Sequence, residues 1–231
     1  MRGRVAIVAG GTGALGRAVC RRLLAAGATV CVPYVLAGEL EELRGGLAPD
    51  LRPRLHAEVA DVTDERAFNA FVAGVLEAHG HVDILVNAVG GFAGGDLVST
   101  PLAEWRRLMD LNLTSAVIGC RGVLPAMIRA GGGRIVNIAS RAVVPPLGGF
   151  IAYTVSKAAV ITLTHALAQE VRAWGITVNA VLPSTMDTPA NRRALPDADR
   201  SSWVSTEAVA EVVAFLVSDA AGAVSGAAVP V

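Results

Sequence analysis

The chain has 231 residues, a formal net charge of zero, an apolar fraction of 53% and only 4% aromatic residues. A chain of this length is expected to form a single domain over residues 1–231, with a core of Val, Leu, Ile and Ala. Without a basic footprint, neither nucleic acid nor an anionic membrane surface is an expected partner. Apolar stretches are broken by Gly, Pro or charge short of the ~18 residues of a membrane span, and no signal-peptide pattern is present. We therefore expect a cytoplasmic protein.

The three cysteines, Cys20, Cys31 and Cys120, are scattered along the chain. Their number is odd, and their spacing does not match that of metal ligands. We expect them to be reduced thiols that serve as small core residues, and we expect no metal site.

The first predicted strand, residues 4–9, runs directly into a glycine-rich turn. The turn reads Gly10-Gly11-Thr12-Gly13-Ala14-Leu15-Gly16, and a helical pattern covers residues 14–26. This arrangement brings backbone N–H groups and the positive end of a helix dipole to a pyrophosphate. Three glycines at this spacing also arise by chance in a glycine-rich chain. Their position at the first strand-to-helix junction favours a dinucleotide site.

Strands and helices alternate along the rest of the chain. Further strands are predicted over residues 29–34, 54–59, 82–87, 133–139, 176–181 and 227–229, and helices over 37–46, 64–79, 101–129, 151–174 and 207–218. The helical stretch 101–129 is expected to be bent or to form two helices. Strands that are apolar throughout and alternate with helices require a parallel sheet covered on both faces. The sequence therefore predicts a Rossmann-like, doubly wound α/β fold with about seven strands.

A serine and a tyrosine–lysine pair flank the start of the predicted helix 151–174. Ser140 ends a predicted strand, and Tyr153 and Lys157 lie one helical turn apart. Positions i and i+4 share a helix face, so the Lys157 ammonium is expected to lower the pKa of the Tyr153 phenol from its ordinary value of about 10. That would make Tyr153 a proton donor near neutral pH. Such a pair alone is more often a solvated helix face.

Taken together, these motifs resemble the short-chain dehydrogenase/reductase family. They comprise the glycine turn, Asn87-Ala88-Val89-Gly90, Asn112, Ser140 and Tyr153-x-x-x-Lys157. Ser140 lies thirteen residues before Tyr153, as in the family pattern. Pro183-Ser184-Thr185-Met186-Asp187-Thr188 follows a predicted strand like the family's Pro-Gly-x-x-x-Thr, with Ser184 in place of glycine. The resemblance covers nearly the whole chain and implies hydride transfer between a nicotinamide and a carbonyl or secondary alcohol.

The resemblance also implies four catalytic residues. Tyr153 would be the general acid or base, and Lys157 would lower its pKa and hold the nicotinamide ribose. Ser140 would hydrogen-bond the substrate carbonyl oxygen, and Asn112 would support a proton-relay water. Each has a purely structural alternative, because Ser140 can also cap a turn and Asn112 can bridge backbone in a bent helix.

Cofactor-binding residues follow from the same resemblance. Asp61 and Val62 would contact adenine, and Thr188 would contact the carboxamide. Asn87 matches the family's Asn after the fourth strand, and its structural alternative is to end that strand. Ala9 and Ala14 replace the family's usual Thr and middle Gly. The full implied set is Gly10, Thr12, Gly13, Ala14, Leu15, Gly16, Tyr34, Asp61, Val62, Asn87, Ala88, Tyr153, Lys157, Pro183 and Thr188.

The choice between NAD and NADP depends on the end of the predicted strand 29–34. An NAD enzyme of this layout usually has a carboxylate there, but the segment reads Val32-Pro33-Tyr34-Val35 and also lacks arginine. The missing carboxylate removes a repulsion against NADP, and the missing arginine removes an attraction. The sequence leaves both cofactors open, with a slight preference for NADP.

The expected substrate pocket is apolar, and its lid is short. Residues between Thr188 and Thr206 are polar and few, and the walls are expected to come from Phe92, Val143, Val144, Pro145, Pro146, Leu147, Phe150 and Met186. A small carbonyl or alcohol is the expected substrate, and a flat heterocycle is an alternative. A non-catalytic dinucleotide-binding regulator is the alternative function.

Assembly is predicted from the two long helical segments, 101–129 and 151–174. Apolar residues of the second spread over more of its circumference than one sheet contact would bury. Small residues such as Ala158, Ala159 and Ala166 permit close helix approach. We therefore expect a homo-oligomer, either a dimer or a tetramer.

Overall fold

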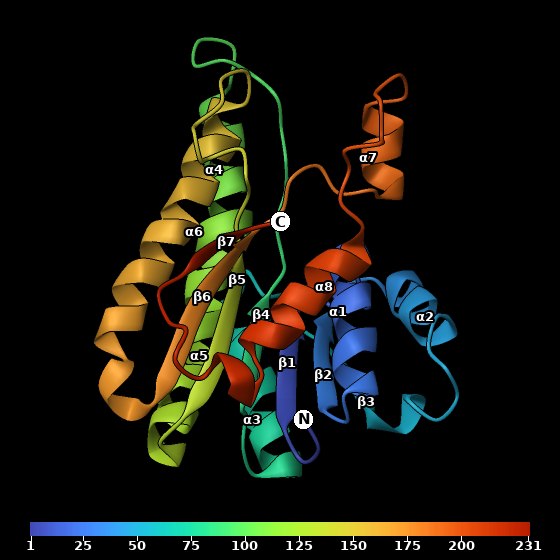
Figure 1. Cartoon of the computed structure of the whole chain (residues 1–231), viewed down its shortest axis with the longest axis vertical. Coiled ribbons are helices and arrows are strands. Elements are labelled where there is room, and N and C mark those ends of the chain that lie inside the picture. Colours follow the sequence, from blue (N-terminus) through green and yellow to red (C-terminus); the bar gives the residue numbers. More distant parts are fainter.

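Seven parallel strands form one sheet in the order β3-β2-β1-β4-β5-β6-β7 (Figure 1). The computed structural model describes all residues, 1–231. Its strands are β1 (Val5–Ala9), β2 (Thr29–Tyr34), β3 (Leu55–Val59), β4 (Ile84–Asn87), β5 (Gly133–Ile138), β6 (Ile176–Leu182) and β7 (Ala228–Pro230). The strand order reverses between β1 and β4, and in such sheets ligands bind in the crevice at the carboxyl ends beside that reversal. The predicted Rossmann-like fold is confirmed.

Helices cover both faces of the sheet because its strands are apolar on both sides. In β1, Ala6 and Val8 pack into one core cluster, while Val5 and Ile7 pack into the other. The first face is covered by α1 (Ala14–Ala25), α2 (Ala37–Gly45) and α8 (Thr206–Leu216). The second is covered by α3 (Glu65–His79), α5 (Ser115–Ala130) and α6 (Ile151–Glu170). The two core clusters therefore fix the sheet between two layers of helices.

The expectation that the stretch 101–129 forms two helices is confirmed, because it consists of α4 (Leu102–Met109), a π-helical turn (Asp110–Thr114) and α5. Other predicted boundaries are wrong. Helix α6 ends at Glu170, and a separate short turn covers Arg172–Trp174 before Gly175 adopts a left-handed conformation. A helix that the sequence did not predict, α7 (Pro189–Ala194), stands apart at the upper right of Figure 1. Pro189 lies in its first turn, where the missing N–H costs no helical hydrogen bond.

Two helical segments are long and apolar enough to cross a membrane by length and composition alone. They are Leu102–Ala130 and Ile151–Glu170. Both segments are interrupted by charge or proline, as the sequence indicated, for example by Arg121 and Pro125 in the first and Lys157 in the second. Within this fold α5 packs against β4 and β5, α6 packs against β5 and β6, and α4 packs against α6. Roughly half of each apolar window is buried. Core helices of globular proteins pass the same test.

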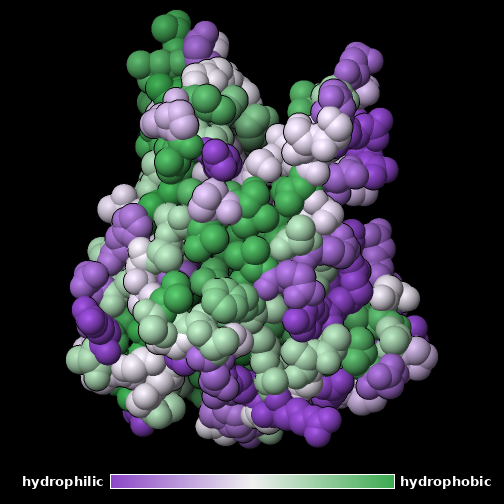
Figure 2. Space-filling view, in the orientation of Figure 1, coloured by the Kyte–Doolittle hydropathy of each residue, from purple (hydrophilic) through white to green (hydrophobic).

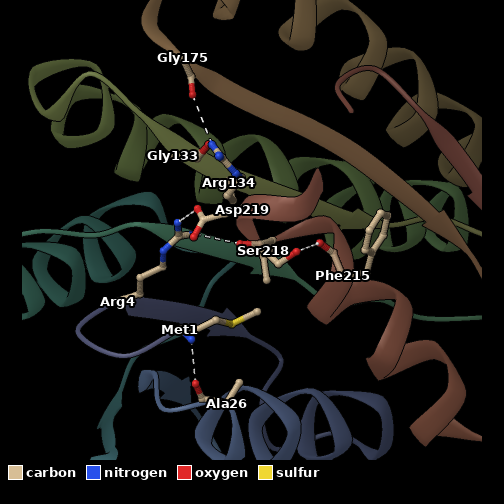
Figure 3. Close-up of polar contacts among 10 residues, drawn as sticks. Met1, Arg4, Ala26, Gly133, Arg134, Gly175, Phe215, Ser218 and Asp219 are labelled. Carbon is tan, nitrogen blue, oxygen red and sulfur yellow. Dashed lines mark hydrogen bonds and ion pairs between the residues drawn. The ribbon is translucent and has the colours of Figure 1, made fainter. Parts of the chain in front are cut away.

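The amino-terminal edge of the sheet is fastened by charged groups that find partners within the chain (Figure 3). Arg4 forms an ion pair with Asp219 and donates to the Val217 carbonyl oxygen at 3.0 Å. The amino group of Met1 donates to the Ala26 carbonyl oxygen at 2.8 Å, and Arg134 donates to that of Gly133 at 3.0 Å. These contacts tie the beginning of the chain to the segments that follow α1 and α8. They lie at the opposite edge from the cleft described next.

Candidate active site

The glycine turn between β1 and α1 is shaped to accept an anion. Gly10 has a φ of +79°, and a Cβ atom on Gly16 would lie 1.9 Å from the Gly10 carbonyl oxygen. Helix α1 begins after Gly13 without a side-chain cap and without an acidic residue in its first turn. The N–H groups of that first turn, which includes Ala14, Leu15 and Gly16, thus remain available. A pyrophosphate fits here because helix N-termini bind anions.

A cleft of about 350 Å³ continues from this turn along the carboxyl ends of β2, β3 and β4. Seven residues predicted to bind the cofactor line it: Gly10, Thr12, Gly13, Tyr34, Asp61, Val62 and Ala88. The complete lining is Gly10, Thr12, Gly13, Pro33, Tyr34, Val35, Glu39, Ala60, Asp61, Val62, Thr63, Ala88, Val89, Gly90 and Leu111. Its position at the strand-order reversal between β1 and β4 is where a dinucleotide fold holds its adenosine.

Sequence reasoning missed Glu39 in this cleft. The residue lies in the first turn of α2, and its Oε2 accepts a hydrogen bond of 2.7 Å from the Thr12 hydroxyl. The end of β2 contains no carboxylate, as the sequence indicated, but the following helix supplies one to the same cleft. An acidic residue in the first turn of the helix after the second strand was the available signal.

Asn87 does not line the cleft, although it was predicted to bind the cofactor. Its side chain is buried and donates to Asn137 Oδ1 on β5 at 2.9 Å. Asn137 in turn donates to the Thr164 hydroxyl on α6 at 2.9 Å. This chain of buried amides faces the interior because β4 is central in the sheet and α5 covers it. The Asn87 side chain therefore links β4, β5 and α6 beneath the site.

Ser140 and Tyr153 meet in the space beyond the end of β5. Tyr153 lies in the first turn of α6, and its phenol lies near enough to the Ser140 hydroxyl to be influenced by it, while Ser140 Oγ accepts from the Ala142 N–H at 3.2 Å. Burial raises the pKa of Tyr153, and the Ser140 hydroxyl opposes that shift. The expectation that Lys157 lowers this pKa is wrong for the protein alone, because Lys157 does not contribute to the shift. Burial therefore keeps the phenol in its protonated form, and the lowered pKa expected from the sequence is not seen in the protein alone.

Lys157 is buried, and its ammonium donates to the Ile138 carbonyl oxygen at 2.8 Å. Because burial disfavours the charged form, the pKa of Lys157 falls to about 8. Gly90 lies beside it, and a Cβ atom there would be 3.0 Å from Lys157 Nζ and 2.7 Å from Asn112 Oδ1. Only a glycine therefore lets these two side chains approach the loop after β4 so closely.

Asn112 sits in the π-helical turn between α4 and α5 and is almost fully buried. Its Oδ1 accepts from the Gly91 N–H at 2.9 Å, and its Nδ2 donates to the Gly91 carbonyl oxygen at 3.0 Å and to Ser156 Oγ at 2.9 Å. The extra residue of the π turn aims this amide at the loop after β4. Asn112 thus joins α6, which carries Tyr153 and Lys157, to that loop.

Pro183 and Thr188, the last two residues predicted to bind the cofactor, lie after β6. The Pro183 carbonyl oxygen accepts from the Arg141 N–H at 2.9 Å and so joins this loop to the segment after Ser140. The Thr188 hydroxyl caps α7 by accepting from the Asn191 N–H at 3.2 Å. Neither residue lines the adenosine cleft. The polar segment after Thr188, expected to be a short lid, contains α7 and an Asp187–Arg192 ion pair.

An apolar surface surrounds the opening above Tyr153. The Phe92 ring lies 5.0 Å from the Tyr153 ring and 5.7 Å from the Phe150 ring, between centroids. Figure 2 shows hydrophobic side chains gathered from the centre of the view to its upper left, with a hollow between that region and the arm that bears α7. Exposed apolar residues of the loops around the opening include Phe92, Leu97, Val98, Val144 and Leu147.

A doubly wound sheet with an anion-binding glycine turn and a Ser140–Tyr153–Lys157 cluster defines a class, the dinucleotide-dependent oxidoreductases. Comparison with known proteins agrees, since a family profile described as short chain dehydrogenase matches residues 4–199. The chain belongs to the short-chain dehydrogenase/reductase family.

Its relatives are named as dehydrogenases and reductases. The chain is 36% identical to 2-(R)-hydroxypropyl-CoM dehydrogenase of Xanthobacter autotrophicus, over 97% of this chain and 95% of that protein. The crystal structure of levodione reductase superposes with a TM-score of 0.92 at 29% identity, covering 100% of this chain and 96% of that one. NAD⁺-bound xylitol dehydrogenase gives a TM-score of 0.90 at 27% identity, covering 100% and 98%.

These likenesses assign the chemistry at the level of the family. The protein is an NAD(P)-dependent oxidoreductase that acts on alcohol or carbonyl substrates. The non-catalytic alternative gains no support from any of them. Three of the four predicted catalytic residues, Ser140, Tyr153 and Lys157, lie close together at the end of β5, and Asn112 braces the loop beside them.

Proposed function

We propose that this protein interconverts a secondary alcohol and a ketone that carries an apolar or aromatic group, with Tyr153 as the general acid in reduction and the general base in oxidation. The observation that carries the proposal is the Tyr153 phenol beside the Ser140 hydroxyl at the end of β5, with the Phe92 and Phe150 rings packed around the Tyr153 ring. Phe92 and Phe150 pack edge-on around the Tyr153 ring, which favours a flat apolar substituent next to the reacting carbon.

The protein's own groups divide the work as follows. When bound, the nicotinamide supplies or accepts the hydride. The Ser140 and Tyr153 hydroxyls donate hydrogen bonds to the substrate oxygen, and Tyr153 delivers its proton as that oxygen gains negative charge. Lys157 supplies an ammonium close to this pair, and Asn112 holds the loop after β4 in register with α6. Gly10, Gly13 and the first turn of α1 cradle the pyrophosphate.

The experiment is a substrate panel followed by absorbance at the nicotinamide band. Aryl ketones, aliphatic ketones, short polyols and flat quinonoid heterocycles are each offered with NADH and with NADPH. We expect aryl and long-chain aliphatic ketones to be reduced with the highest kcat/KM. A panel in which only polyols are oxidised would contradict the apolar substrate, and reduction only of the heterocycles would support the alternative substrate class.

Three further expectations belong to this proposal. The apolar surface that the two long helical segments leave uncovered supports a homo-oligomer, dimer or tetramer, whose mass in solution light scattering can measure. A cytoplasmic location is proposed from the sequence and is tested by cell fractionation. The slight preference for NADP rested on the missing carboxylate at the end of β2, and the position of Glu39 weakens that ground.

A further inference from the structure

We propose that Glu39 reads the 2′ position of the adenosine ribose and makes the protein select NAD over NADP. The inference rests on the proposed function only in requiring that a nicotinamide dinucleotide binds in the cleft of about 350 Å³. It replaces the sequence-based preference for NADP, which considered the end of β2 and not the helix that follows.

Glu39 is held in the cleft by the same turn that cradles the pyrophosphate. Its Oε2 accepts the 2.7 Å hydrogen bond from the Thr12 hydroxyl, and Thr12 is itself buried within the glycine turn. Its Oε1 accepts no hydrogen bond from the protein. A carboxylate anchored by one oxygen with the other left open is suited to accept hydrogen bonds from ribose hydroxyls.

The negative charge of the cleft also favours NAD over NADP. Its only charged lining residues are Glu39 and Asp61, and neither lysine nor arginine lines it. Asp61 is exposed and already accepts two hydrogen bonds from Thr63, at 2.8 Å and 2.7 Å. A 2′-phosphate would bring close to two negative charges next to Glu39 with no cation to pair them. Repulsion between these like charges disfavours the binding of NADP relative to NAD.

The nearest cation of the glycine turn is engaged elsewhere. Arg17 of α1 donates to Glu42 Oε2 at 2.7 Å and to the Thr12 carbonyl oxygen at 2.9 Å. It lies outside the cleft lining, between α1 and α2. Arg17 is therefore satisfied by protein groups and does not offer its guanidinium to a 2′-phosphate.

The test is equilibrium binding, followed by the fluorescence of NADH and NADPH on the full chain. We expect the wild type to bind NADH at least about tenfold more tightly than NADPH. Glu39→Gln keeps the size and an oxygen that can accept from Thr12 but removes the charge. In that variant we expect the ratio of the two dissociation constants to fall to within about threefold, mainly because NADPH binds more tightly.

Glu41→Gln is the matched control. It removes the same charge from the same helix, but Glu41 is exposed, contacts Arg44 and does not line the cleft. Its NADH preference is expected to equal that of the wild type. A wild type that binds NADPH as tightly as NADH, or a Glu39→Gln variant that retains the full preference, would overturn the proposal. Failure of both cofactors to bind would instead contradict the proposed function.

Discussion

Charged residues have opposite roles at the amino-terminal and carboxyl-terminal ends of the parallel strands, here called the amino-terminal and carboxyl edges of the sheet. At the amino-terminal edge, Arg4 pairs with Asp219, and Asp83 accepts from the Val5 N–H at 2.7 Å, so charge ties elements together. At the carboxyl ends of the strands, Glu39 lines the cleft with its Oε1 unbonded, and Tyr153 and Lys157 lie beyond the end of β5. The difference shows that polar residues at the first edge serve stability, whereas those at the second serve a ligand.

The largest expected effect is on turnover, from Tyr153→Phe at the carboxyl edge. The ring still packs against Phe92 and Phe150, so the fold should be unchanged, but the proton donor is lost. General acid–base catalysis typically contributes ~10²–10⁴-fold, and kcat should fall by about that factor. Steady-state kinetics measures it, with NADH fluorescence titration as the control for intact cofactor binding. Turnover within a few-fold of the wild type would remove Tyr153 from the mechanism.

Gly16→Ala should damage the other end of the same cleft. The new Cβ would lie 1.9 Å from the Gly10 carbonyl oxygen, and because that atom is backbone, the whole turn must move. We expect cofactor affinity to fall at least tenfold and the free energy of unfolding to fall by about 1–3 kcal/mol. Fluorescence titration and urea unfolding measure the two effects.

The matched control is Gly45→Ala in α2. A Cβ at Gly45 has no atom within 4 Å, so neither cofactor affinity nor stability should fall, and alanine favours a helix. Equal behaviour of the two variants would mean that the glycine turn does not hold the cofactor.

Lys157 should make stability depend on alkaline pH. Its pKa is about 8 in the folded protein and near 10.5 for an exposed lysine, so the folded state gives up its proton first. The unfolded state then binds more protons at this site between these two values, so the contribution of Lys157 to stability should rise from pH 8 to 10.5, by on the order of 3 kcal/mol. This gain is lost as pH falls through 8. Burial raises the pKa of the Cys20, Cys31 and Cys120 thiols, which lowers stability over the upper part of the same range. Urea unfolding of the wild type and of Lys157→Met across this range tests it, since the stability of the wild type relative to the variant should increase from pH 8 to 10.5, and a constant difference would contradict it.

The smallest effect is expected at the amino-terminal edge. Arg4→Ala removes an ion pair whose partner, Asp219, is 85% exposed, and exposed pairs contribute only ~0–1 kcal/mol. Thermal unfolding should shift slightly, while kcat/KM should match the wild type because no cleft residue is touched. A large loss of activity from Arg4→Ala would contradict the separation of the two edges.

The sequence predicted those features that depend on local pattern. Apolar strands alternating with helices defined the sheet, and the spacing from Ser140 to Lys157 predicted a cluster that the structure brings together at the end of β5. The sequence did not predict features that depend on how elements distant in the chain pack together. The carboxylate of Glu39 comes from α2 to a cleft formed by β1, β2 and β3, and Asn87 turns into the core because α5 covers β4. The pKa of Tyr153 depends on burial, which helical spacing does not report.

The most direct test of the carboxyl edge as a hydride-transfer site is isotopic. The wild type is incubated with an aryl ketone and NADH that carries deuterium at both C4 positions of the nicotinamide, and the alcohol is analysed by mass spectrometry. The account predicts one deuterium on the carbinol carbon, formed at a rate that Tyr153→Phe lowers by about 10²–10⁴-fold. An alcohol product without deuterium would contradict direct transfer at this site.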